Sequence, residues 1–577
     1  MLKLFRFLRP YRAVIALVMA LILLQSLSEL YLPTIMADIV NVGVIEGRTS
    51  YIWKMGGFML AVTLAGTAVS ILASYHSSQI SSAFGRIVRG KVFSHVESFS
   101  LREFGELGTA SLITRTTNDI NQVQQVLMMM LRMMVMAPMM CIGGIIMALY
   151  KDAQLTLVLL VALPVLAGAI WLVASKGLPY FRVIQKKLDR LNLVLREGLT
   201  GIRVIRSFNR TEHEKGRFEE ANRDLMDTAV KVNQIMAVMM PLMMLIMNLA
   251  IVAIVWFGGL RIDAGGMLVG DLMAFISYAM QIMFSLLMFS MMFVMVPRAS
   301  ASAARIGEVL QLSPTIEDMP DASGGEEEML NGEVEFRNVS FSYPGAEKPA
   351  LSGISFHAKA GELTAIIGGT GSGKTSLLHL VPRFFDTESG SVIVGGKDVR
   401  SWTQEELRRH ISLVPQKAVL FSGTVNANIR YGKEDASDEE VRRAAAIAQA
   451  LDFVEAMPEG FESELSQGGV NLSGGQKQRL SIARALVRRP MVYLFDDSFS
   501  ALDYKTDAKL RAALKEETRD AAVLVVAQRV STVMDADRIV VLDEGRIAGI
   551  GRHDELMETC SVYREIVASQ LSEEEIA

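Results

Sequence analysis

Six long apolar blocks in the first half of the chain constrain its fold more than any other feature. A helix needs roughly 20 apolar residues to cross a membrane, and each block is about that long. The predicted spans are residues 13–36, 55–75, 126–150, 155–174, 232–258 and 272–296. The N-terminal segment is basic, and no small-residue cleavage pattern stands out after its long apolar block, so we expect a retained first span and no cleaved signal peptide.

The connections between spans alternate in length and charge. Three connections are short with few charges, whereas about 50 residues join spans two and three, and again spans four and five. Basic residues gather at the N-terminus, in both long connections and after the sixth span: Lys3, Arg6, Arg9, Arg12; Arg86, Arg89, Lys91, Arg102, Arg115; Lys176, Arg182, Lys186, Lys187, Arg190; Arg298 and Arg305. Because such residues favour the cytoplasmic side, we expect a multi-pass protein with a cytoplasmic N-terminus, in a plasma membrane of bacterial type.

The long connections have helical periodicity. The stretches FSHVESFSLREF and IQKKLDRLNLVLREGL repeat apolar residues at spacings of three and four. We therefore expect spans two to five to continue as helices into the cytosol. Since a helix rises about 1.5 Å per residue, roughly 20 extra residues would reach about 30 Å beyond the membrane.

A shift in composition separates the two halves. Residues 312–332 hold Pro314, Pro320, Gly324 and Gly325 with an acidic run, which indicates a linker. The predicted domains are 1–311 (membrane), 312–332 (linker) and 333–577 (soluble α/β). The net charge of −4 gives no electrostatic case for nucleic acid, and two cysteines in different halves make no disulfide framework.

A glycine loop in the second half carries the sharpest chemical signal. A short apolar strand at residues 363–367 runs into GGTGSGKT, which fits the pattern GxxxxGK[ST], and a helical pattern follows. The predicted ATP-binding residues of this loop are Gly368, Gly369, Thr370, Gly371, Ser372, Gly373, Lys374, Thr375 and Ser376. Backbone N–H groups would close around phosphates, Lys374 would meet the β/γ-phosphates, and Thr375 would hold Mg²⁺.

Two further segments fit the same chemistry. An apolar strand at 491–495 ends in Asp496, an acidic position suited to Mg²⁺. Between the loop and this strand lies a Ser-Gly-Gly sequence that opens a helix, and helix N-termini bind anions. The predicted cofactors are therefore ATP and Mg²⁺, with metal ligands from Thr375 and Asp496.

With LSGGQ ahead of the strand that ends in Asp496, the chain resembles a half-transporter of the ATP-binding-cassette (ABC) exporters. The resemblance covers nearly the whole chain and implies a six-span α-helical membrane domain with long cytoplasmic helix extensions, followed by an α/β P-loop ATPase cassette. It implies that two cassettes pair head to tail, with each ATP between the Walker motifs of one and the signature of the other. The expected partners are a second half-transporter, the lipid bilayer and a hydrophobic small molecule. We expect no nucleic-acid partner.

The resemblance also assigns roles to residues outside the glycine loop. Tyr343 matches the aromatic residue that stacks on adenine. Gln416 matches the Q-loop, which the resemblance implies contacts Mg²⁺ and the membrane domain. The signature is Leu472, Ser473, Gly474, Gly475 and Gln476, and the D-loop is Ser500, Ala501, Leu502 and Asp503. Segments 103–109 and 207–214 match the two coupling helices, and Phe208 and Glu212 are the predicted coupling residues.

Two positions depart from the family pattern. Asp497 stands where the family has the glutamate that polarises the attacking water, and Gln528 stands where it has the switch histidine. A carboxylate set back by about 1 Å can cost about 10²-fold in rate, and glutamine cannot carry a proton or a positive charge. Gln467 also stands where a glutamate is common. We expect impaired hydrolysis at this Walker site.

The signature, by contrast, is intact, and it serves the site of the opposite subunit. This combination resembles the degenerate-site subunit of bacterial heterodimeric multidrug exporters, and we expect a non-identical partner that carries the missing glutamate and histidine. The alternative is a homodimer with slow but adequate hydrolysis.

Methionine is heavily used, with 35 residues, many of them in the spans. Methionine is flexible and polarisable, so these residues predict either an adaptable cavity for hydrophobic compounds or ordinary packing against helices and lipid. The candidate cavity residues are Arg132, Met240, Met247, Asn248, Gln281, Met288 and Met291. We expect export of hydrophobic or amphipathic, drug-like compounds; the alternatives are lipid or peptide export on the same frame, or a subunit that mainly clamps ATP for its partner.

Overall fold

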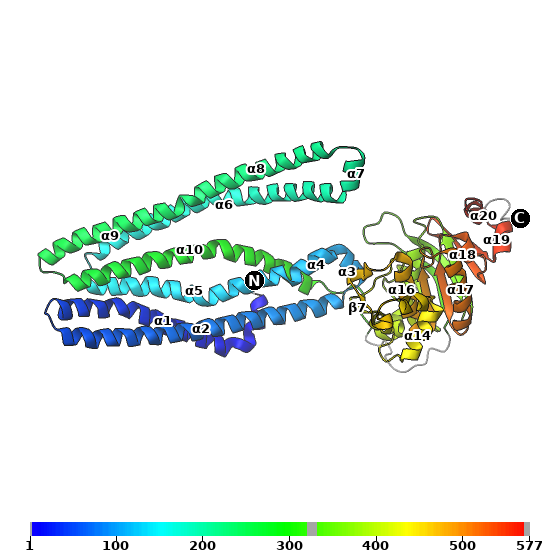
Figure 1. Ribbon diagram of the computed structural model, residues 1–577, viewed down its shortest axis with the longest axis horizontal. Coiled ribbons are helices and arrows are strands. Elements are labelled where there is room, and N and C mark those ends of the chain that lie inside the picture. The colour runs from blue at the N-terminus through cyan, green and yellow to red at the C-terminus, as the bar shows by residue number, and fades with distance from the viewer. Residues whose placement is uncertain (1–2, 320–331, 571–577) are drawn as a thin grey trace. The chain divides into compact units, whose positions relative to one another are not determined.

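The computed structural model describes residues 3–319 and 332–570 (Figure 1). It divides into two compact units. The first holds the chain up to Glu97 and Ala110–Leu312, and the second holds Ser98–Thr109 and the chain from Ser313 onward. Of the predicted linker 312–332, residues 320–331 lie outside the described part.

The first unit is entirely helical and contains six helical stretches long and apolar enough to cross a membrane. Its elements are η1 (Leu4–Tyr11), α1 (Arg12–Asp38), η2 (Ile39–Val44), α2 (Thr49–Glu97), α4 (Thr109–Thr116), α5 (Asn118–Lys151), α6 (Thr156–Thr200), α7 (Ile202–Ser207), α8 (Thr211–Ala237), α9 (Met239–Asp263) and α10 (Val269–Gln311). The predicted six-span fold is confirmed. The fifth span is broken at Val238, next to the first turn of α9 that holds Pro241, a position where the missing N–H of proline is tolerated.

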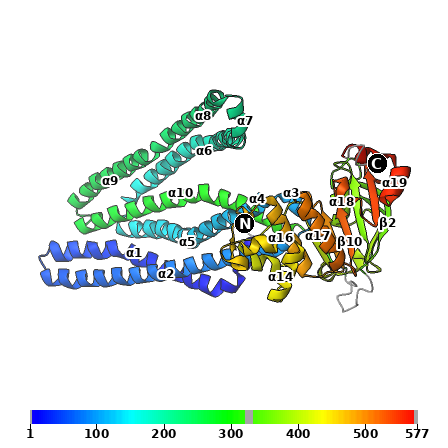
Figure 2. The ribbon, with the colours of Figure 1, turned by 45° about the vertical axis from the view of Figure 1, so that its right-hand side comes forward.

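The helices run far past the spans, as the periodicity predicts. α2 has 49 residues, α6 has 45 and α10 has 43. At about 1.5 Å per residue α2 is about 74 Å long, more than twice the thickness of a bilayer core of about 30 Å. Figures 1 and 2 both show the hairpin of α6, α7, α8 and α9 diverging from α10 toward the α7 end.

Close approaches at small residues fix where α1, α5 and α10 meet. A Cβ added to Gly143 would lie 2.4 Å from the Cδ1 of Leu30 on α1, and one added to Gly144 would lie 2.6 Å from the Cγ1 of Ile282 on α10. The Tyr278 hydroxyl, fully buried, donates to the carbonyl of Leu30 at 3.0 Å. Since a transmembrane bundle gains its association energy from such close packing, these contacts hold the three helices in one register.

The second unit is an α/β domain with the short helix α3 (Leu101–Leu107) from the first long connection. Its strands are β1 (Val334–Phe341), β2 (Leu351–Ala358), β3 (Leu363–Gly368), β4 (Ser389–Val394), β5 (Lys397–Asp398), β6 (Ile411–Val414), β7 (Gly423–Thr424), β8 (Glu464–Leu465), β9 (Val492–Asp496), β10 (Ala522–Val526), β11 (Arg538–Asp543) and β12 (Arg546–Gly551). Its helices are η3 (Val399–Ser401), η4 (Gly460–Glu462), η5 (Gln467–Gly469), α11 (Lys374–Leu380), α12 (Gln404–Arg409), α13 (Val425–Arg430), α14 (Asp438–Ile447), α15 (Leu451–Glu455), α16 (Gly474–Val487), α17 (Tyr504–Glu517), α18 (Val530–Val533), α19 (His553–Thr559) and α20 (Ser561–Ala568).

The sheet topology places the chemistry. The larger sheet has the order β12-β11-β3-β10-β9-β6, in which β12 pairs antiparallel with β11 and the other neighbours are parallel. A smaller antiparallel sheet has the order β2-β1-β4-β5, and β7 pairs with β8. The central strands are buried on both faces, as expected for a parallel sheet covered by helices. Ligands in such sheets bind beyond the carboxyl ends of the strands, where β3, β9 and β10 end together.

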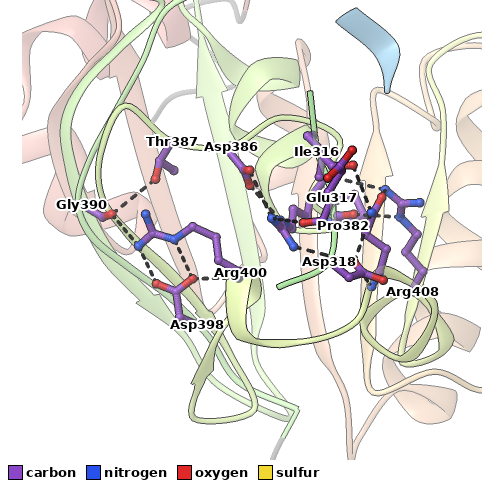
Figure 3. A network of polar contacts seen from close by, with 12 residues as sticks. Ile316, Glu317, Asp318, Pro382, Asp386, Thr387, Gly390, Asp398, Arg400 and Arg408 are labelled. Carbon is purple, nitrogen blue, oxygen red and sulfur yellow. Dashed lines mark hydrogen bonds and ion pairs between the residues drawn. The ribbon is translucent and has the colours of Figure 1, made fainter. Parts of the chain in front are cut away.

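The segment that follows α10 is held onto the second unit by a polar network (Figure 3). Arg383, whose side chain is 3% exposed, donates to Asp386 at 2.8 Å and to the carbonyl of Glu317 at 3.3 Å. Gln404 at the start of α12 donates from its backbone to Asp318 at 3.0 Å. Glu317 and Asp318 of the predicted linker therefore have defined contacts with the cassette.

Candidate nucleotide site and membrane cavity

The glycine loop between β3 and α11 has a backbone that only glycine allows. Gly371 and Gly373 have φ angles of 83° and 96°, in the left-handed region that side chains disfavour. A Cβ on Gly373 would also lie 2.7 Å from the carbonyl oxygen of Ala350. The strand, the loop and the helix that opens at Lys374 are the context in which this motif binds phosphate.

Lys374 lies inside this loop and is 8% exposed. Its Nζ donates to the carbonyls of Gly368 at 2.8 Å and Gly369 at 2.6 Å. Burial lowers the pKa of Lys374, while the nearby carboxylates of Asp497 and Asp496 act in the opposite direction. The loop thus surrounds a cation with backbone groups, an arrangement suited to anionic oxygens.

Asp496 ends β9 next to the loop. Thr375, in the first turn of α11, donates its hydroxyl to the carboxylate at 3.0 Å. Burial raises the pKa of Asp496, and the Thr375 hydrogen bond opposes this rise. A hydroxyl and a carboxylate are oxygen ligands of the kind that Mg²⁺ takes, together with phosphate oxygens and water. The donor set fits Mg²⁺, with Thr375 and Asp496 as the residues that would hold it.

Asp497 follows directly and has a left-handed backbone with φ 46°. Its N–H donates to the carbonyl of Val526 at 2.9 Å, which ties the end of β9 to the end of β10. Gln416, just beyond β6, donates its side-chain amide to the Asp497 carboxylate at 3.2 Å. The structure thus brings together Asp497, at the position that the resemblance assigns to polarising the attacking water, and Gln416 of the predicted Q-loop.

Gln528 lies beyond β10 at the same sheet edge, since Val526 is paired with Asp496. Its side chain is exposed, and its main-chain carbonyl accepts from Gln570 at 2.8 Å. Gln467, in η5, is also exposed.

Tyr343 lies close to the glycine loop. Its hydroxyl is 2.9 Å from the hydroxyl of Ser376 in α11, and its ring packs edge-on against Phe341 and Phe385. The ring is 39% exposed, so a flat ligand can reach it. Stacking on adenine stays a prediction.

The signature and the D-loop lie side by side. Ser473 caps the N-terminus of α16 in a capping box with Gln476, and a Cβ on Gly475 would lie 3.1 Å from the carbonyl of Ala501. Asp503 caps α17 by accepting from the N–H of Thr506 at 3.0 Å, and that hydrogen bond lowers its pKa. In the first turn of α16 the N–H of Ser473 donates to the side-chain oxygen of Gln476 at 2.9 Å, and the N–H of Lys477 donates to the carbonyl of Ser473 at 3.0 Å.

The two predicted coupling segments lie in different units. Phe208 follows α7 with its side chain 74% exposed, and Glu212 in the first turn of α8 pairs only with Lys215, at 2.6 Å, among the described side chains. The first segment, around α3, belongs to the second unit, where Glu103 is buried and accepts from the backbone of Thr315 at 3.2 Å.

A cavity of about 610 Å³ opens among α1, α2, α5, α9 and α10 of the first unit. Half of its lining residues are methionines, eight of sixteen, which supports the adaptable-cavity reading of the methionine content. Of the candidate residues, Met247, Gln281 and Met288 line it. Arg132, Met240 and Asn248 are exposed on their helices and are not among the lining residues, and the side chain of Met291 lies outside the described part.

Sequence reasoning missed Glu29, which lines this cavity from α1. Its carboxylate accepts from the side-chain amide of Gln25 at 2.9 Å. A carboxylate inside an apolar span is itself a signal, because such residues are expensive in a bilayer and mark functional positions. The same rule singled out Arg132 in the third span and could have found Glu29 in the first.

Comparison with known proteins agrees with this arrangement. The family described as ABC transporter transmembrane region matches residues 15–286, and the family described as ABC transporter matches residues 351–500. An uncharacterized ABC transporter ATP-binding protein of Mycobacterium tuberculosis is 44% identical over 97% of each chain. The ATP-dependent lipid A-core flippase of Chromobacterium violaceum is 31% identical over 99% of this chain and 97% of its own. The structure of a bacterial Atm1-family ABC exporter with ATP bound superposes with a TM-score of 0.81 at 25% identity, over 97% of this chain and 99% of that one.

The fold and the site therefore define a membrane transporter whose transmembrane region is fused to an ATP-binding cassette. The chain belongs to the ABC transporter family and has the exporter arrangement of a half-transporter, six apolar helices followed by one cassette. ABC exporters work as dimers in the membrane, and the ATPase family implies ATP, generally with Mg²⁺, as the ligand.

Proposed function

We propose that this chain is one subunit of an ATP-driven exporter that moves hydrophobic or amphipathic compounds out across the plasma membrane, with its N-terminus and cassette in the cytoplasm. The observation that carries the proposal is the pairing of a methionine-rich cavity in the membrane unit with a complete glycine loop, Walker aspartate and signature in the cassette. ATP would bind at Gly368–Ser376 with Tyr343 against adenine, and the signature would complete a site on the partner.

We further propose that hydrolysis at this chain's own Walker site is slow. Support comes from Asp497, whose shorter carboxylate is hydrogen-bonded by Gln416 and is 8% exposed. Gln528, at the same sheet edge, has an amide side chain that cannot carry a positive charge toward a developing phosphate. Together they weaken both the activation of water and the stabilisation of charge, the two contributions on which phosphoryl transfer depends.

A weak Walker site beside an intact signature favours a non-identical partner. In a head-to-tail dimer the signature here would face the Walker motifs of the other chain, and a partner with glutamate and histidine would supply the working site. Two copies of this chain would instead combine two slow sites. A homodimer is the alternative outcome of the test below.

The test is steady-state ATP hydrolysis by the full chain in lipid nanodiscs, compared with Asp497→Glu combined with Gln528→His. We expect a nearly inactive chain that the double substitution activates by about tenfold or more. Lys374→Ala in the activated background is the control, because it removes the cation of the loop and should abolish the gained activity. A wild-type chain that already turns over at roughly several per second would refute the slow-site proposal and favour a working homodimer.

A lipid exporter is the second candidate. The relative from Chromobacterium violaceum is named a lipid A-core flippase, and it matches this chain over nearly its whole length. Both movements can be measured in the same ATP-loaded proteoliposomes: that of a fluorescent phospholipid between leaflets and that of a lipophilic dye. The comparison distinguishes a lipid exporter from an exporter of hydrophobic compounds.

A further inference from the structure

One acidic side chain lies in the wall of the methionine-rich cavity. Glu29 is the only charged residue among the described lining residues, and the rest are apolar or neutral. It lies 17 residues after the start of α1 at Arg12, about 26 Å along the helix, and about 14 Å before its end at Asp38. The carboxylate therefore lies well inside the span, where a charge is costly unless water or a ligand meets it.

The protein gives Glu29 little to neutralise it. Gln25, one turn away on the same helix, donates a hydrogen bond at 2.9 Å. In the described part of the chain no lysine or arginine lies within 4.0 Å of its carboxylate. A carboxylate held at this depth without a cationic partner is suited to a positive charge that comes with a ligand.

Gln281 on α10 lines the same cavity and has an unused acceptor. Its side-chain carbonyl oxygen is buried, and no hydrogen-bond donor reaches it among the described residues. A buried oxygen of this kind is destabilising unless a ligand or water supplies a donor or a positive charge. The serines that line the cavity differ in this respect, because Ser277 donates to the carbonyl of Met273 and Ser285 to that of Ile282.

The two groups lie at a similar depth. Tyr278 donates to the carbonyl of Leu30, the residue after Glu29, and Gln281 is less than one helical turn beyond Tyr278. α1 and α10 therefore contribute a carboxylate and an amide side chain to the lining of one cavity, whose other described lining residues are mostly methionine and other apolar side chains. An anionic ligand would meet repulsion from Glu29, and none of the described lining residues is a lysine or arginine that could offset it.

We propose that the cavity selects amphipathic monocations, with Glu29 as the residue that recognises the charge and Gln281 as a second polar contact. This inference rests on the proposed export of hydrophobic compounds and names the substrate class. The apolar body of the ligand would pack on methionines such as Met136 and Met288, and the cationic centre would lie near the Glu29 carboxylate. Charge complementarity supplies specificity, and the deformable wall tolerates different shapes.

Tetraphenylphosphonium and tetraphenylborate test the inference, because they have nearly the same size and shape and opposite charge. Equilibrium dialysis would measure the binding of each to the full chain in nanodiscs, with neutral triphenylphosphine oxide as the third probe. We expect the wild type to prefer the cation by about tenfold or more over the anion, and Glu29→Gln to remove that preference. Glu29→Asp keeps the charge and should keep the preference, and Gln281→Leu should weaken cation binding by about threefold.

Glu46→Gln is the matched control, because this glutamate lies outside the cavity and pairs with Arg48 at 2.9 Å; it should bind all three probes as the wild type does. Nucleotide binding by the cassette confirms that each variant is folded, and comparison of variants in identical nanodiscs cancels partition into lipid. If wild type and Glu29→Gln bind the cation equally while the neutral probe still binds, the charge inference is wrong and the proposed export of hydrophobic compounds stands. If no probe binds the wild type above empty nanodiscs, both fail.

Discussion

Glu103 offers a direct test of how the first predicted coupling segment is held. Its carboxylate, 2% exposed, accepts from the N–H of Ser100 at 2.7 Å in the capping box of α3, from the N–H of Thr315 at 3.2 Å and from the Thr315 hydroxyl. The two oxygens face different donors, one toward α3 and one toward the segment after α10. Glu103→Gln leaves a single acceptor, because the amide replaces the other oxygen with a donor.

The expected cost follows from these contacts. Hydrogen bonds to a charged group contribute about 1.5–3 kcal/mol, and neutral ones about 0.5–1.5 kcal/mol. Glu103→Gln loses the hydrogen bonds to one of the two oxygens, and the bonds to the other oxygen no longer involve a charged group. The loss should cost about 2 kcal/mol, which corresponds to roughly 30-fold faster opening of α3. Amide hydrogen exchange of peptides covering residues 98–109 and 313–319, in the full chain in nanodiscs, measures this opening.

Glu106→Gln is the control on the same helix. Glu106 is about half exposed and pairs with Arg102 at 3.2 Å, so its loss should change exchange by less than about threefold. If the two variants behave alike, or if only residues 98–109 respond, the reasoning from shared contacts is refuted.

The pH dependence of the same segment has a defined sign. Burial alone would raise the pKa of Glu103, but the hydrogen bonds from Ser100 and Thr315 outweigh it and hold the pKa below its usual range. Because the folded-state pKa is lower than the unfolded value of about 4.3, the stabilisation is fully present above that pH. It is lost as the pH falls through the folded-state pKa, so wild-type protection should approach that of Glu103→Gln in acid.

Two pairs of substitutions, each a test with its control, probe the cassette by its thermal midpoint. Gly373→Ala places a Cβ 2.7 Å from the carbonyl oxygen of Ala350, on a backbone with φ 96°. It should lower the stability of the cassette by about 2 kcal/mol and its thermal midpoint by about 5 °C. Gly369→Ala is the control, because its Cβ meets nothing within 4 Å, and it should change the midpoint by less than about 2 °C. Arg383→Ala removes a buried cation from the network that holds residues 316–318 and should cost about 3 kcal/mol, whereas Arg409→Ala, 61% exposed, should be near neutral. Equal shifts within either pair would contradict the structural reason given for it.

Much of the fold follows from local sequence. The apolar blocks predicted the six spans, and the spacings of three and four in the long connections predicted the helical extensions seen in α2 and α6. The strand, glycine loop and helix around Lys374 lie where the motif predicts them. Each of these features depends on residues close together in the sequence. The period of apolar residues and the backbone freedom of glycine both determine local structure over short stretches of chain.

The contacts within the candidate site were not predictable in this way. Gln416 and Asp497 are 81 positions apart and meet because β6 and β9 are parallel neighbours. The cavity depends on how α1, α5 and α10 approach at Gly143 and Gly144, so Met288 lines it while Met240 is exposed on α9.

The sequence by itself determined the class of protein and the six spans, and it predicted the type of each phosphate-binding segment. Tertiary structure alone decided that α3 is held to Thr315 by Glu103, and that Glu29 and Gln281 share a cavity. The physical reason is that the sequence of a helix shows which of its residues are apolar. Which face of the helix lines a cavity depends instead on how that helix is rotated and packed against its neighbours. Those depend on many small contacts between residues far apart in the chain.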